Sequence, residues 1–215
     1  MNMVNFNKGR ASIYNFLASA YMVPADSRFV STAREYLPYF QILKEEIPSL
    51  AEGVDGLTLA LENEINEQDF IVAHTRLFSL GVCAGSIASS ESVYTSDLEL
   101  AMQEVCERIK HFYSLFGFDM PANFKEAEDH IAAELLFMAF LADKFAYYII
   151  AGDKKGVEKY MKAQKDLMQT HLLRWVPEFC NLLISKADEA NTLLVCMSKM
   201  LEAYLAHDAD FLRGL

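Results

Sequence analysis

Apolar residues recur at intervals of three and four along almost the whole chain, and this spacing constrains the fold more than any other feature. One such set precedes Pro24 and comprises Ile13, Phe16, Leu17, Ala20 and Tyr21. This period places apolar side chains on one face of a helix. Alternation with a period of two and hairpin dipeptides such as Asn-Gly are missing from the sequence. We therefore expect an all-α protein, folded as a single globular multi-helix domain over residues 1–215.

The same spacing, with Pro and Gly as end signals, predicts where the other helices lie. After the helix before Pro24, the expected helices cover residues 29–38, a stretch up to about 47, 68–78, 96–116, 125–151, a helix capped by Asp153, one with Pro177 in its first turn, and 190–211. The most apolar runs, on either side of Asp143 and Lys144, are far shorter than the roughly 20 residues of a membrane span. We expect no stable membrane insertion.

Composition excludes several classes of function. The chain has 215 residues, 53% of them hydrophobic, which suits one large core. Its formal charge of −11 argues against nucleic acid, because phosphate binding depends on Lys and Arg, whereas a basic peptide is favoured. The four cysteines are widely separated and contain no Cys-x-x-Cys pair, so we expect reduced thiols in a cytoplasmic protein. No export signal is visible at the start of the sequence.

A stretch rich in Gly, Ser and Ala at residues 80–95 is the one long segment without helical spacing. Structureless stretches of this length are uncommon inside compact domains, so it is either a hinge or a loop that forms a site. As a hinge, it would permit helices to be exchanged between two copies. We therefore expect a monomer or a domain-swapped homodimer.

Acidic and imidazole groups gather at the start of the most apolar expected helix. These are Glu128, Asp129, His130 and, one turn later, Glu134. Asp129 suits a capping role, and His130 suits a structural hydrogen bond or, if it is not deeply buried, a protonated state between two acids. A metal site from His130 and Glu134 is disfavoured because no second pair completes it. A polar notch beside an apolar helix also suits a cationic partner.

No phosphate-binding loop, nucleophile elbow or His-Glu-x-x-His motif is present, so we expect no enzyme, no cofactor and no metal. An alternative is a helical protein that binds a small molecule or nucleotide in the acidic notch around Asp129 and His130. A purely structural helical adaptor is a third possibility.

Three motifs follow one another in a recognisable order: Glu91-Ser92-Val93-Tyr94, then Glu128-Asp129-His130-Ile131-Ala132-x-Glu134-Leu135, then His171-Leu172-x-x-Trp175-x-Pro177-x-Phe179. Together they resemble the TorD/DmsD family of redox-enzyme maturation chaperones, which are relatives of the NarJ-type chaperones. The resemblance covers most of the chain. The Glu-Asp-His motif is its most specific part.

The resemblance implies a cytoplasmic, all-helical chaperone of the TorD-like type. Such a protein binds the twin-arginine signal peptide of the apo-form of a molybdopterin-containing oxidoreductase and assists cofactor insertion before export. A guanidinium group needs carboxylates that accept forked hydrogen bonds beside an apolar surface, and Tyr94, Phe78, Phe137 and Met138 are candidates for that surface. The residues expected to bind the signal peptide are Asp129, His130, Glu91, Ser92, Tyr94, Glu128 and Glu134.

Overall fold

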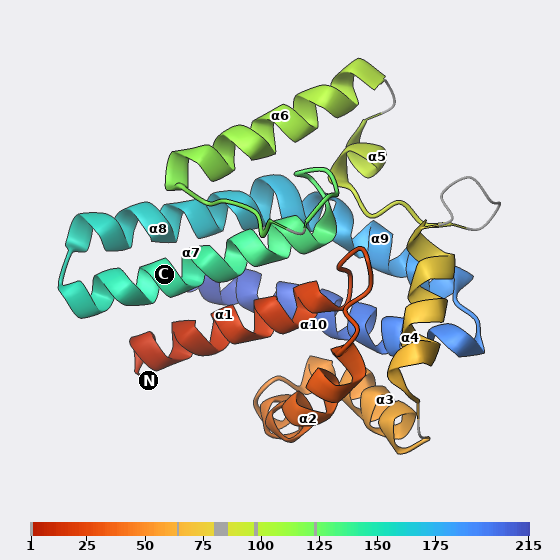
Figure 1. The fold of residues 1–215 in the computed structure, drawn as a ribbon. Coiled ribbons are helices and arrows are strands. Elements are labelled where there is room, and N and C mark those ends of the chain that lie inside the picture. Colours follow the sequence, from red (N-terminus) through yellow and green to blue (C-terminus); the bar gives the residue numbers. More distant parts are fainter. Residues whose placement is uncertain (1, 64, 80–85, 97–98, 123) are drawn as a thin grey trace. The chain divides into compact units, whose positions relative to one another are not determined.

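The computed structural model describes residues 2–63, 65–79, 86–96, 99–122 and 124–215, and these residues form helices joined by short connections (Figure 1). The principal helices are α1 (Met3–Ser19), α2 (Phe29–Glu46), α3 (Ala51–Glu62), α4 (Glu67–His74), α5 (Glu91–Thr95), α6 (Glu99–Phe116), α7 (Ile131–Ala151), α8 (Lys154–Leu167), α9 (Leu173–Lys186) and α10 (Thr192–Gly214). In the described residues the only pairing of β type is an isolated bridge between Ser90 and His130. The all-α prediction is confirmed.

Short turns of other helical types adjoin these helices. They are 3₁₀ turns at Pro48–Leu50 and Glu189–Asn191 and π turns at Thr75–Ser79 and Met168–Leu172. Within the described ranges, none of the helices combines the length and the hydropathy that crossing a bilayer requires. The thiols of Cys106, Cys180 and Cys196 are free, and Cys83 lies outside the described residues.

The chain divides into two compact units. Unit 1 comprises Met1–Ala18, Ser90–Trp175 and Ala209–Leu215, and unit 2 comprises Ser19–Ser89 and Val176–Asp208. The expectation of one domain over the whole chain stays a prediction. Every residue expected to bind a partner through its charge or hydroxyl group belongs to unit 1.

Unit 1 is built around α7, whose side chains are buried along most of its length. Phe137 from this helix is fully buried and contacts aromatic rings of α6 and of the connection that follows it, with ring centroids 4.6 Å from Tyr113 and 5.1 Å from Phe118. Aromatic pairs of this kind add to the free energy of burial. Phe137 and Met138 therefore belong to the core, not to an exposed binding surface.

Helices α7 and α8 form a hairpin whose turn was readable in the sequence. Gly152 ends α7 in the left-handed conformation, with φ of 67°, which glycine adopts without steric cost. Asp153 then accepts hydrogen bonds from the backbone N–H groups of Lys155 and Gly156 and so caps α8. The predictions for both ends of this turn are confirmed.

Gly156→Ala should lower the free energy of unfolding by about 1–2 kcal/mol, the cost of overpacking less the helix propensity gained. A Cβ atom on Gly156 would lie 2.2 Å from Cδ1 of Tyr148, whose ring stacks on that of Tyr160. Urea unfolding followed by circular dichroism measures the change. Gly214→Ala is the matched control, because nothing lies within 4 Å of its added Cβ. Equal effects in the two variants would contradict the packing shown here.

Unit 2 contains α3, a helix that the sequence did not predict. Its two glycines lower helix propensity, but they allow close contact with α10, because a Cβ on Gly53 would lie 2.5 Å from Cγ of Met200 and one on Gly56 would lie 2.8 Å from Sγ of Cys196. The helix expected at 68–78 is found as α4 with its π turn, and its apolar face is buried at Phe70, Ala73, His74 and Leu77.

Two proline boundaries were predicted wrongly. Pro38 lies inside α2, which is one helix over Phe29–Glu46 instead of two. Pro177 is the fifth residue of α9, not part of its first turn, because α8, the π turn Met168–Leu172 and α9 follow one another without a break. A proline removes one backbone hydrogen bond, and in both helices buried side chains lie on either side of it.

Candidate functional site

The start of α7 differs from the expectation. The helix begins at Ile131, with His130 as its N-cap, and not near residue 125. Nδ1 of His130 accepts a hydrogen bond from the backbone N–H of Ala132 at 3.1 Å. Glu128 and Asp129 therefore precede the helix instead of lying in its first turn. They lie in a turn in which His130 N–H donates to Ala127 O at 3.1 Å. Asp129 O also accepts a hydrogen bond from Glu91 N–H at 2.9 Å, and His130 pairs with Ser90.

Asp129 caps a different helix from the one expected. Its Oδ2 accepts a hydrogen bond of 2.9 Å from the backbone N–H of Ser92, in the first turn of α5. The helix α5 is itself a correction, because residues 80–95 were expected to be non-helical, although residues 80–85 lie outside the described part. A carboxylate at a helix N-terminus is stabilised by free N–H groups. Asp129 thus holds the Glu-Ser-Val-Tyr segment against the start of α7.

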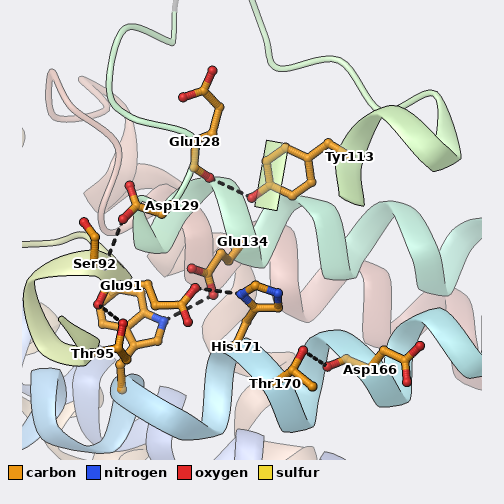
Figure 2. A network of polar contacts seen from close by, with 11 residues as sticks. Glu91, Ser92, Thr95, Tyr113, Glu128, Asp129, Glu134, Asp166, Thr170 and His171 are labelled. Carbon is orange, nitrogen blue, oxygen red and sulfur yellow. Dashed lines mark hydrogen bonds and ion pairs between the residues drawn. The ribbon is translucent and has the colours of Figure 1, made fainter. Parts of the chain in front are cut away.

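A second hydrogen-bonded group lies just inside α5 and joins residues of α5, of the π turn Met168–Leu172, of α9 and of α7 (Figure 2). Oε2 of Glu91 lies 2.7 Å from Nδ1 of His171, and Nε1 of Trp175 donates to Oε2 of Glu134 at 3.3 Å. Burial, and then the charge of Glu91, raise the pKa of Glu134 well above its ordinary value. This shift favours the protonated, neutral form of Glu134.

This group also contains a set of atoms able to ligate a metal. One atom each from Glu91, Glu134 and His171 lie within 4.8 Å of one another, and two carboxylates with an imidazole suit transition metals. His130, the imidazole considered in the sequence, is not part of this set. The hydrogen bond between His171 and Glu91 joins two of these three candidate ligands.

The structure brings the predicted residues together, but it places most of them in the interior. Glu91, Asp129, His130 and Glu134 are each at most 1% exposed, and Ser92 is 6% exposed. Two members reach solvent: Tyr94 is half-buried, and the side chain of Glu128 is 37% exposed and pairs with Lys110 at 3.3 Å. Tyr94 also lies against Trp175, with ring centroids 5.4 Å apart. Of the seven predicted residues, Glu128 and Tyr94 are therefore the most accessible to solvent.

Burial decides the protonation state of His130. It lowers the pKa of the imidazole to about 4, against the smaller opposing effect of Asp129. His130 is therefore neutral at neutral pH, and the protonated state suggested by its acidic neighbours does not form. In the described part of the chain, Nε2 of His130, Oδ1 of Asp129 and Oε1 of Glu134 are buried without a hydrogen-bond partner. Such atoms carry a free-energy cost that a suitable ligand would remove.

Reasoning from the sequence missed the tie between Glu91 and His171, which are 80 positions apart. It used His171 and Trp175 only as part of the third motif and assigned them no role in the site. It also gave no role to Cys106, although burial and Asp129 raise the pKa of this thiol to about 12. Phe78, considered part of an apolar surface, belongs to unit 2. The only available signal was that His171 and Trp175, one helical turn apart, share a face.

Comparison with known proteins identifies several relatives. The chain is 28% identical over 171 residues to the perchlorate reductase assembly chaperone protein of Dechloromonas aromatica (strain RCB), covering 78% of this chain and 75% of that protein. It is 26% identical over 120 residues to the selenate reductase assembly chaperone protein of Thauera selenatis, covering 56% and 58%. It is 25% identical over 223 residues to the chaperone protein TorD of Aliivibrio salmonicida (strain LFI1238), covering 100% of both. No solved structure matches.

A family model described as nitrate reductase delta subunit matches residues 44–181, a range that includes α5, the start of α7 and His171. This range is more than half of the 215 residues. The chain therefore belongs to the nitrate reductase delta subunit family, which confirms the resemblance to the TorD and NarJ-type redox-enzyme maturation chaperones.

Proposed function

We propose that this protein is a cytoplasmic chaperone that binds the twin-arginine signal peptide of a molybdopterin-containing oxidoreductase and assists its maturation before export. Its relatives are named as assembly chaperones of perchlorate and selenate reductases and as TorD, so the client proposed here is a redox enzyme of that kind. Family members carry the names of chaperones, not of catalysts, which agrees with the lack of catalytic motifs in the sequence.

One observation carries the proposal for the signal peptide. Oδ1 of Asp129 and Oε1 of Glu134 are buried carboxyl oxygens without a hydrogen-bond partner in the described residues, and both lie beside α5. A guanidinium group has several N–H donors in one plane and binds such oxygens in a forked geometry. The net charge of −11 favours the approach of a cationic peptide.

Access to these oxygens requires α5 to move. This helix has only five residues, and its Val93 is 47% exposed. Two hydrogen bonds hold its inner face: one joins the side chains of Glu91 and His171, and the other runs from the backbone N–H of Ser92 to the carboxylate of Asp129. We propose that the peptide first contacts Glu128 and Tyr94 and that its arginines then replace these ties. Binding therefore couples to displacement of the Glu-Ser-Val-Tyr segment.

A synthetic peptide with two arginines followed by an apolar stretch should bind with a dissociation constant near 1 μM, the affinity expected of a short peptide that must displace a protein segment. Calorimetry measures the affinity, which should weaken with added salt. Emission from Trp175, the only tryptophan, should change on binding because its ring packs on Tyr94 in α5. A lysine pair should bind more weakly, because lysine lacks the planar fork.

Asp129→Asn provides the sharpest variant. An asparagine oxygen still accepts the hydrogen bond from Ser92, so the fold is kept, while the charge that attracts a guanidinium is lost. We expect affinity to fall about tenfold, equivalent to about 1.4 kcal/mol. Glu126→Gln is the matched control, since Glu126 is an exposed neighbour on the same connection. Failure of the folded wild-type protein to bind any twin-arginine peptide would refute the proposed function.

A further inference from the structure

An open groove lies on unit 1, on the side of α7 that faces away from the buried acids. It has a volume of about 290 Å³, and its walls come from α1, from the connection between α6 and α7, and from α7 (Figure 1). The lining residues are Asn15, Phe118, Asp119, Pro121, Leu136, Ala139, Phe140 and Asp143. Leu136 is about 200° around the helix from Glu134, so the groove and the buried acids use opposite faces of α7.

The walls of the groove are apolar and held in place by packing. Leu136, Ala139, Phe140 and Asp143 follow helical spacing and so share one face of α7. The ring of Phe118 packs on those of Phe137 and Phe140, with centroids 5.1 and 5.3 Å apart. Phe118, Leu136 and Phe140 are only half-buried, so apolar surface remains open to a ligand.

The rim of the groove is acidic. Asp119 and Asp143 are exposed, and neither forms an ion pair within the described ranges. The nearest cation in the sequence is Lys144, whose Nζ lies 5.5 Å from the ring centroid of Phe140 and 5.8 Å from that of Tyr147. One ring of the wall thus already accepts a cation, as aromatic faces do. The groove offers two carboxylates without countercharges beside an apolar floor.

We propose that this groove receives an extended peptide segment in which a guanidinium group adjoins apolar side chains, an inference that rests on the proposed function. The apolar side chains pack on Phe118, Leu136 and Phe140, and the guanidinium group binds Asp119 and Asp143. Two carboxylates suit arginine because its planar group of N–H donors can donate to several acceptor oxygens at once. Unlike Asp129 and Glu134, these carboxylates are reachable without moving a helix. The groove therefore provides a preformed contact for a twin-arginine leader, in addition to the contact at Glu128 and Tyr94.

The test uses the double variant Asp119→Asn with Asp143→Asn and a matched control, Glu104→Gln with Glu158→Gln. Both remove two exposed carboxylates of unit 1 and change the net charge equally. Calorimetry is done with a peptide of two arginines followed by leucines and phenylalanines, and with the same peptide carrying serines instead. The groove variant should weaken binding of the apolar peptide about tenfold and the control less than about twofold. The affinity for the serine peptide should change equally in the two double variants.

A second measurement locates the peptide directly. A benzophenone group in the apolar stretch should cross-link to residues 118–121 and 136–143, as mapped by mass spectrometry. Tight binding with cross-links only to α5, and equal effects of the two double variants, would show that the groove does not bind the peptide. The proposed function would then remain intact. A wild-type protein that binds no such peptide would instead refute the proposed function itself. A concentration-dependent dimer abolished only by the groove variant would assign the groove to a second copy and overturn the inference.

Discussion

Glu91→Leu should lower the free energy of unfolding by about 3 kcal/mol, whereas Glu134→Gln should change it by less than about 1 kcal/mol. The two glutamates are neighbours in one buried group, but their contacts differ. Glu91 accepts the hydrogen bond of His171, so a leucine at this position leaves a buried ring nitrogen without a partner. The raised pKa of Glu134 favours its neutral form, and glutamine is the neutral isostere.

Urea unfolding followed by circular dichroism and by the emission of Trp175 distinguishes the two variants. Glutamine at position 134 keeps an oxygen to accept the N–H group of Trp175, so the local emission spectrum should also be preserved. The leucine variant should shift the emission because α5 loses its tie to His171. Equal destabilisation by both substitutions would indicate a charged Glu134 and would contradict the raised pKa of this group.

When the pH is lowered from 7 to 5, the free energy of unfolding should fall by about 2 kcal/mol more in the wild-type protein than in His130→Asn. The reason is that the imidazole has an ordinary pKa near 6.5 in the unfolded chain and a lowered pKa in the folded protein. His130 has a pKa of about 4 in the folded protein. Between these two values the unfolded chain binds more protons than the folded chain does. Stability from His130 is therefore complete above pH 6.5 and is lost as the pH falls toward 4.

Asparagine suits this comparison because it is a strong N-cap and does not titrate. It keeps an acceptor for the backbone N–H of Ala132, which His130 now serves. Glu134 contributes a pH dependence of the opposite sign, since its pKa is raised, but this contribution is common to both proteins. The measurement is the urea midpoint of each protein at both pH values. Parallel loss of stability in the two proteins would mean that His130 is accessible to protons.

Much of the fold was predictable because local signals agreed with it. The apolar face of α1 at Ile13, Phe16 and Leu17, the stop of α6 before Gly117 and the turn at Gly152 and Asp153 all follow from spacing and caps. Pro38 misled the prediction because burial on both sides of a proline can outweigh its lost hydrogen bond. Helix α3 was missed because its glycines serve contacts with α10, which lie far away in the sequence.

The candidate site was predictable in its members but not in its geometry. The sequence singled out Glu91, Asp129, His130 and Glu134. Figure 2 shows Glu91, Asp129 and Glu134 close together, and His130 pairs with Ser90, next to Glu91. The sequence alone could not show that Asp129 caps α5 or that His171 forms a hydrogen bond with Glu91, because both contacts join distant segments. Burial of these groups also depends on the whole of unit 1, so their pKa values follow from tertiary packing and not from neighbours in the sequence.

Because of the π turn at Met168–Leu172, the hydrogen bond between Trp175 and Glu134 depends on the number of residues between α8 and α9. The π turn places one extra residue between the regular turns of α8 and α9. Removing one residue there would give an ordinary α-helix but would rotate Trp175 by about 100° about the axis relative to the preceding turns. The indole would then point away from Glu134. Single-residue deletions in this stretch are therefore more disruptive than substitutions of its exposed side chains.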